Sequence, residues 1–153
     1  MQKQSAVTAL NIIHKALLMG QIVFATVCAY LIYSKTVEPP APELEKILQV
    51  IALVITFTCI YASFAIFKKK LMQIREMQAG VKEKFEQYRA ASILQWALIE
   101  GPAIFSIIGF FLTGNYAFLA LLLAIIFLFA MTSPSKLKIQ LQLQLSEADL
   151  EEL

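Results

Sequence analysis

Charged side chains are scarce in this chain. Only 16% of its 153 residues are Asp, Glu, Lys or Arg, whereas 59% are hydrophobic. Soluble domains carry about 25% charged residues, so this chain is short of the groups that cover a water-facing surface. The net charge is only +2, and no basic stripe alternates with aromatic residues. The composition therefore speaks against nucleic-acid binding and against an ordinary soluble domain.

Residues that carry catalysis or bind metals are also few. The chain has one histidine, His14, and two cysteines, Cys28 and Cys59, which lie inside apolar runs and at no metal-ligand spacing. We interpret both cysteines as small buried hydrophobes. No glycine-rich phosphate loop and no nucleophile–base set is present, so we expect neither an enzyme nor a cofactor.

Long apolar runs dominate the rest of the chain, and the mean hydropathy is +0.69. A helix of about 20 residues crosses the roughly 30 Å of bilayer hydrocarbon. The runs predict an all-α membrane protein whose transmembrane domain covers residues 1–133, with spans at about 10–33, 46–68, 91–113 and 115–133. The first run is too long for a signal peptide and no small-residue cleavage site follows it, so we expect it to be retained.

The distribution of lysine and arginine predicts the orientation. If the N-terminus, the loop at 68–92 and the tail share one side, the other side holds only Lys35 and Lys46. The first side then holds Lys3, Lys15, Lys68, Lys69, Lys70, Arg75, Lys82, Lys84, Arg89, Lys136 and Lys138. By the positive-inside rule both termini are cytoplasmic. We expect an integral protein of the bacterial cytoplasmic membrane type.

The chain resembles two copies of one helical hairpin. Residues 16–21 align with residues 97–102, and the same offset pairs further aromatic positions. Each copy opens with a small-xxx-small pair, which lets helix backbones approach closely in lipid. These pairs are Ala16 with Gly20 and Ala97 with Gly101, and Pro102, directly after the second pair, is expected to disturb the helix locally. We therefore predict two tandem hairpins.

An amphipathic pattern extends the second and third spans into a cytoplasmic helical hairpin over residues 68–92. Its apolar residues recur at spacings of three and four, with a turn at Ala79-Gly80. They are Leu71, Ile74, Met77, Val81, Phe85 and Tyr88. We interpret this stripe as the seam of the hairpin, and the alternative is a docking face for a partner helix.

The tail, residues 134–153, has a different pattern. Apolar and polar residues alternate over 137–145, which predicts a β-strand with one apolar face: Leu137, Ile139, Leu141, Leu143 and Leu145. A lone strand needs a partner, so we expect pairing with a second copy of the chain. A different membrane protein is the second possibility, and a frayed tail the third. Ser146 and Asp149 predict the start of a short helix at 147–152.

Glu100 is the only charged residue well inside a span, about 10 Å deep at 1.5 Å per residue. A charge near the bilayer centre costs about 2.5–3.5 kcal/mol, so such a residue is a candidate functional group. The hydrocarbon favours its neutral form unless donors or a cation face it. Gln21, Tyr61 and Ser63 are candidate hydrogen-bond partners for Glu100, and Lys15 is a candidate salt-bridge partner. Together they would form a candidate proton- or ion-binding site without a metal.

The segment Ala97–Phe105 resembles the carboxylate-bearing helix of subunit c of rotary ATP synthases, and the two-hairpin layout resembles the duplicated proteolipid of V-type ATPases. The resemblance covers these nine residues and implies that Glu100 binds and releases a proton. The glycine-rich packing helix of that family has no counterpart in the first two spans.

Three functions fit the sequence. The first is a structural or accessory component of a membrane assembly, in which Glu100 is a hydrogen-bonded packing residue. The second is a proton- or ion-handling protein in which Glu100 titrates. The third is a small oligomeric carrier.

Overall fold

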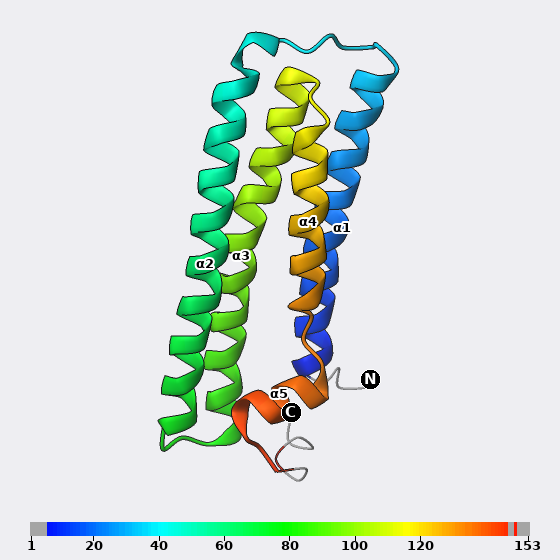
Figure 1. The fold of residues 1–153 in the computed structure, drawn as a ribbon. Coiled ribbons are helices and arrows are strands. Elements are labelled where there is room, and N and C mark those ends of the chain that lie inside the picture. The colour runs from blue at the N-terminus through cyan, green and yellow to red at the C-terminus, as the bar shows by residue number, and fades with distance from the viewer. Residues whose placement is uncertain (1–5, 147–148, 150–153) are drawn as a thin grey trace.

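A computed structural model describes residues 6–146 and residue 149, and these residues form helices joined by short connections. The order is α1 (Ala6–Tyr33), a short 3-10 turn η1 (Pro42–Leu44), α2 (Glu45–Glu76), α3 (Val81–Thr113), α4 (Ala117–Met131) and α5 (Lys136–Leu143). The first four α-helices run up and down, and α5 crosses one end of the bundle (Figure 1). We call this end, where α2 turns into α3, the basic end.

Three helical segments are long and apolar enough to cross a membrane: Ala6–Tyr33, Pro42–Glu76 and Val81–Thr113. The 15-residue α4 meets the same criterion only together with α5, from which it is bent by 73°. The described part of the chain thus has three such helices, or four if the bent pair is one span. The prediction of apolar helices that fit a membrane is confirmed.

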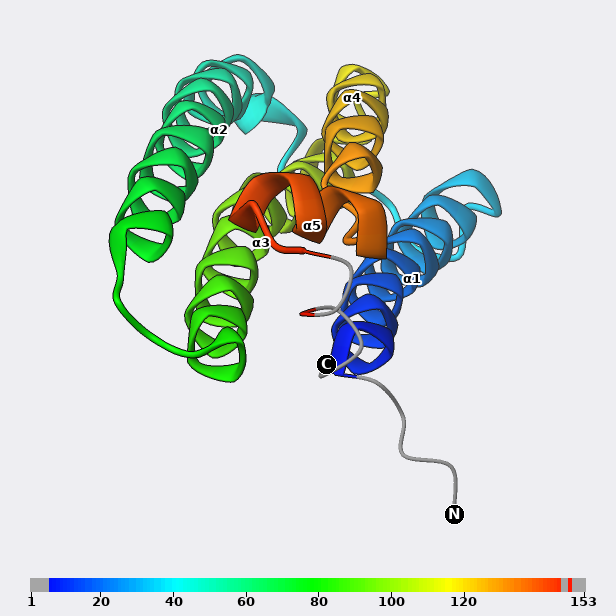
Figure 2. The same ribbon diagram turned by 90° about the horizontal axis from the view of Figure 1, so that it is seen from below.

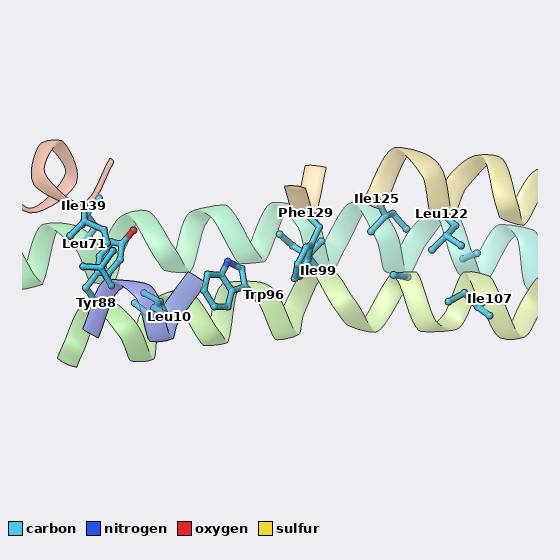
Figure 3. Close-up of a cluster of buried hydrophobic side chains, with 14 of the residues drawn as sticks. Leu10, Leu71, Tyr88, Trp96, Ile99, Ile107, Leu122, Ile125, Phe129 and Ile139 are labelled. Atoms are coloured by element: carbon cyan, nitrogen blue, oxygen red, sulfur yellow. The ribbon is translucent and has the colours of Figure 1, made fainter. Parts of the chain in front are cut away.

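Helix α3 is the centre of the bundle. It packs against α1, α2 and α4, whereas α1 and α2 lie on opposite sides of it (Figure 2). The first two spans therefore do not pack on each other as a hairpin, although α3 and α4 do. The main apolar core runs lengthwise between α3 and α4 (Figure 3), with Ile99 and Ile107 on α3 and Leu122, Ile125 and Phe129 on α4.

Small residues at buried positions allow close helix contacts. On α2 these are Ala52, Thr56 and Ser63. Gly109 on α3 packs directly against α4, because a Cβ atom there would lie 2.6 Å from Cε1 of Phe118.

The small residues that the sequence singled out lie elsewhere. Ala16, Gly20, Ala97 and Gly101 are exposed, and a Cβ atom at either glycine would have no neighbour within 4 Å. Only Pro102 is buried, in a continuous α3. These four residues form no close helix contact within the described chain.

The predicted C-terminal strand is wrong, because its residues form α5. Ser135 caps the helix by accepting a hydrogen bond from the Lys138 amide at 3.2 Å. A helix satisfies its own backbone groups, whereas the strand had no second strand to pair with. In an alternating pattern, residues four apart are both apolar, and residues four apart lie on the same side of a helix. Ile139 (0% exposed) and Leu143 therefore pack on the bundle, while Leu137 and Leu141 (67% exposed) face outward. The helix predicted at 147–152 lies outside the described residues, apart from Asp149.

The seam expected in the loop at 68–92 is covered by α5. Leu71, Ile74, Phe85 and Tyr88 are buried, and Ile139 of α5 lies beside Leu71 and Tyr88 (Figure 3). A helix of the same chain therefore occupies this face. A hydrogen bond also joins α5 to α2, because Nε of Arg75 donates to the carbonyl of Gln142 at 2.6 Å.

Candidate functional site

Glu100 lies near the middle of α3 and is partly exposed. Within the described chain its carboxyl group makes no hydrogen bond and no ion pair. The four side chains expected around it do not bind it. Lys15 and Tyr61 are exposed on α1 and α2, and the hydroxyl of Ser63 donates to the carbonyl of Ile60 in its own helix at 2.8 Å.

Gln21 is buried, and both polar atoms of its amide lack a partner. It is therefore a buried polar residue of α1 rather than a ligand of Glu100. The predicted proton- or ion-binding cluster is not assembled among the described residues.

Glu100 borders a stripe of exposed residues on α3. The stripe alternates spacings of four and three, as the seam of a coiled coil does. It consists of Ala90, Leu94, Ala97, Gly101, Ile104 and Ile108. Within residues 6–146 no helix covers this outer stripe, although α3 packs against α1, α2 and α4. Its centre, at Ala97 and Gly101, is flat enough for a close helix contact.

A second polar region lies at the basic end, where α1 meets the end of α4. His14 is buried, and its Nε2 atom lies 3.0 Å from the carbonyl oxygen of Phe129. Its ring stacks on Phe129 with centroids 4.6 Å apart and meets the edge of Trp96 at 4.9 Å. These contacts join α1 to both α3 and α4.

Several carbonyl groups at and just beyond the end of α4 accept hydrogen bonds from side chains, because such groups have no partner inside the helix. The hydroxyl of Thr132 donates to the carbonyl of Phe129 at 2.6 Å. Nζ of Lys138 donates to the carbonyls of Met131 at 3.0 Å and Ser133 at 3.4 Å. Asn11 of α1 donates to the carbonyl of Pro134 at 3.2 Å, which fixes the bend between α4 and α5.

A cavity of about 240 Å³ adjoins this region between α2, α3, α4 and α5. Its apolar walls are Phe64, Phe67, Leu128 and Met131, and its polar lining is Tyr88, Ser92, Gln95, Thr132, Lys138 and Gln142. The Tyr88 hydroxyl donates to Oε1 of Gln142 at 2.7 Å, which links α3 to α5. Burial lowers the pKa of the Lys138 amine, so this cation is held in a partly dehydrated place.

Sequence reasoning missed His14 and this polar cavity. The signal for His14 was a seven-residue spacing, because Val7, His14, Gln21 and Cys28 form the buried side of α1. The signal for the cavity was the spacing of Tyr88, Ser92 and Gln95, which places three polar side chains on one face of α3. No composition argument reveals that α5 folds back over them.

No protein-family model, no curated protein and no solved structure matches this chain. The resemblance to rotary ATPase subunit c therefore rests on residues 97–105 alone.

Proposed function

We propose that this chain is a structural or accessory component of a membrane assembly, crossing the bilayer through α1 to α4 with its basic end in the cytoplasm. The apolar lengths of α1, α2 and α3 support the membrane location. The concentration of lysine and arginine at the basic end supports the orientation.

The single observation that carries the proposal is Glu100 on the edge of the outer stripe. Its carboxyl group has no partner within the described chain although it lies near the middle of an apolar helix. An unpaired charge there costs about 2.5–3.5 kcal/mol, and a hydrogen bond across a helix interface reduces that cost. A partner helix seated on the outer stripe places a donor or a cation beside Glu100.

The partner is a different protein rather than a second copy. A symmetric contact between two α3 helices through Gly101 brings the two Glu100 carboxyl groups together, so at most one of them stays ionised and neither gains a cation. A complementary helix offers small residues opposite Ala97 and Gly101, and a polar or basic side chain at the level of Glu100.

Photo-crosslinking in native membranes tests this proposal. A photoreactive residue at Ala97 is expected to give one discrete protein adduct, whose mass exceeds that of the 17.2 kDa chain by the mass of the partner. The same residue at Phe57, which is exposed on α2, serves as the matched control and is expected to give lipid adducts only. Glu100→Ala and Gly101→Leu are each expected to abolish the protein adduct.

Three results would contradict the proposal. These are lipid adducts alone at Ala97, an adduct with twice the mass of the chain, and a protein adduct that survives both substitutions. The second result favours a homo-oligomer such as a carrier.

A further inference from the structure

Two hollows lie between α2 and α4, because residues of both helices line each of them. Figure 2 shows these two helices apart from each other, with α3 between them and further back. One is the cavity at the basic end. The other, of about 200 Å³, lies towards the opposite end and is lined by Gln49, Ala52, Leu53, Ala117, Phe118 and Leu121. Both lie along one gap, because their linings follow the same two helices from one end to the other.

The cavity at the basic end opens sideways. Phe64 on α2 is 44% exposed and Met131 on α4 is 63% exposed, so the two flank a mouth made of apolar side chains. The inference rests here on the proposed membrane location: α2 is long and apolar enough to span a bilayer, and in that setting the mouth faces lipid. A ligand that enters the cavity through this mouth is therefore expected to have a hydrocarbon portion.

The interior of the cavity is polar, in contrast to its mouth. Tyr88, Ser92 and Gln95 line it from α3. Gln95 is only 6% exposed, and within the described chain its amide has no hydrogen-bond partner. The Gln95 amide borders the cavity, so it is free to donate to a polar ligand there.

Lys138 is the positively charged residue in the lining of the cavity. Two of its three N–H groups reach the carbonyls of Met131 and Ser133. Carbonyl groups do not neutralise an ammonium ion, and the described residues place no carboxylate within ion-pair distance of it. A partly buried cation without a counter-ion favours an anionic ligand.

We propose that this cavity binds the acidic headgroup of an anionic amphiphile, with the acyl chain lying along the gap between α2 and α4. The anion meets Lys138, the Gln95 amide donates to its oxygens, and Phe64, Leu128 and Met131 contact the first methylene groups. The volume of 240 Å³ is close to the lower end of ligand pockets, about 300–1,000 Å³, and suits a headgroup rather than a whole lipid. This site lies on a different surface from the outer stripe, so it does not depend on the assembly role.

Native mass spectrometry of the full chain in mild detergent tests the proposal, with phosphatidylglycerol, oleate and phosphatidylcholine as probes. One phosphatidylglycerol or one oleate is expected to bind about tenfold more tightly than phosphatidylcholine. Preference for phosphatidylglycerol identifies a membrane lipid as the ligand, and preference for oleate identifies a free fatty acid. Equal binding of all three probes would overturn the site.

Variants assign the binding to the cavity. Lys138→Gln is expected to remove most of the preference for the anion, whereas Lys136→Gln, the same charge change on an exposed residue of α5, is expected to leave it intact. Ser92→Phe fills the cavity and is expected to abolish binding of the probes. Equal losses from the two lysine variants would show a surface charge effect and overturn the proposal.

A photoreactive phosphatidylglycerol or oleate provides a readout that needs no variant. Its acyl group, activated near the headgroup, is expected to label Phe64, Leu128 or Met131 in the unmodified protein. Labelling confined to other helices would contradict the site even if a variant failed to fold.

Discussion

His14 on α1 stacks against Phe129 on α4, 115 positions later in the chain, and its Nε2 atom lies 3.0 Å from the Phe129 carbonyl oxygen. The pair holds the first helix against the end of the last apolar helix. It does so at the point where the chain bends by 73° into α5. The contact thus joins α1 to the chain just before α5, which is itself bound to α2 through Arg75 and to α3 through Tyr88.

Substituting His14 is expected to loosen α1. His14→Ala removes a buried ring and is expected to lower the free energy of unfolding by about 2–4 kcal/mol. His14→Phe keeps the stacking and loses only the hydrogen bond, worth about 0.6 kcal/mol between membrane helices. Thermal unfolding in detergent measures both, with the exposed Lys15→Ala as control. Equal losses for the alanine and phenylalanine variants would show that the ring contact contributes little.

Paired substitutions distinguish the helix α5 from the strand that the sequence suggested. Ile139→Ala removes a fully buried side chain and is expected to cost about 2–4 kcal/mol of unfolding free energy. Leu141→Ala, at an exposed position, is expected to change it by less than about 0.5 kcal/mol. In a strand the two residues share one face. Similar losses at both positions in the unfolding assay would therefore contradict the helix.

Two glycines of α3 are expected to respond in opposite ways to alanine. Gly109→Ala places a methyl group against Phe118 and is expected to cost about 1–3 kcal/mol. Gly101→Ala meets no neighbour and is expected to be neutral or to stabilise the helix by up to about 1 kcal/mol. Chemical or thermal unfolding of the isolated protein provides the comparison. A destabilised Gly101→Ala would place that residue at a contact within the chain.

Glu100→Leu is expected to leave the isolated protein at least as stable as the wild type. The carboxyl group makes no hydrogen bond within the described chain, and under the proposed membrane topology its removal relieves the cost of a polar group in hydrocarbon. The unfolding temperature in detergent and the yield of inserted protein are the measurements. A large loss of stability would show that Glu100 has an internal partner and would weaken the proposed contact surface.

The turn that follows α5 is expected to be pH-dependent. The Ser146 hydroxyl at 2.7 Å and the Ser146 amide at 2.8 Å both donate to Asp149, and they lower the pKa of its carboxyl group. Because the folded pKa lies below the unfolded one, the contribution to stability is present above the unfolded pKa and is lost as the pH falls through the folded pKa. An NMR titration of Asp149 measures this shift, and Ser146→Ala is expected to return the pKa towards its ordinary value. An unchanged pKa in that variant would refute the assignment.

The sequence predicted which segments are apolar helices better than it predicted which helices touch. Length and hydropathy are properties of each run by itself, so the segments of α1, α2 and α3 could be found one at a time. Neighbours depend on side-chain shape. The exposed Ala16 and Gly20 have the same spacing as a packing motif, yet the glycine that packs directly against another helix is Gly109.

The tail shows a limit of periodicity. An alternating pattern from Leu137 to Leu145 fits a strand with one apolar face, and it also fits a helix with two opposite apolar faces. The deciding information is whether a second strand is available and whether Ser135 can cap a helix. The first of these is a property of the whole chain and not of the nine residues.

The candidate site was predictable only in part. Glu100 was found because a charge stands out in an apolar run, whereas Gln95 and Ser92 were overlooked because uncharged polar residues change hydropathy little. Lys138 was counted only as a charge that sets orientation. Its place in a cavity follows from the direction of the bend after Met131. Pro134 and Ser135 indicate that the helix breaks there, but they do not encode this direction.

The separation of α1 from α2 has a consequence for synthesis of the protein. The ribosome releases α1 first, yet its polar seam of His14 and Gln21 faces helices that follow much later. At about 5–20 residues per second, the 115 residues between His14 and Phe129 take roughly 6–23 s to make. During those seconds α2 does not cover the buried face of α1. Under the proposed membrane topology, this face of the first helix therefore stays exposed until the end of α4 has been made.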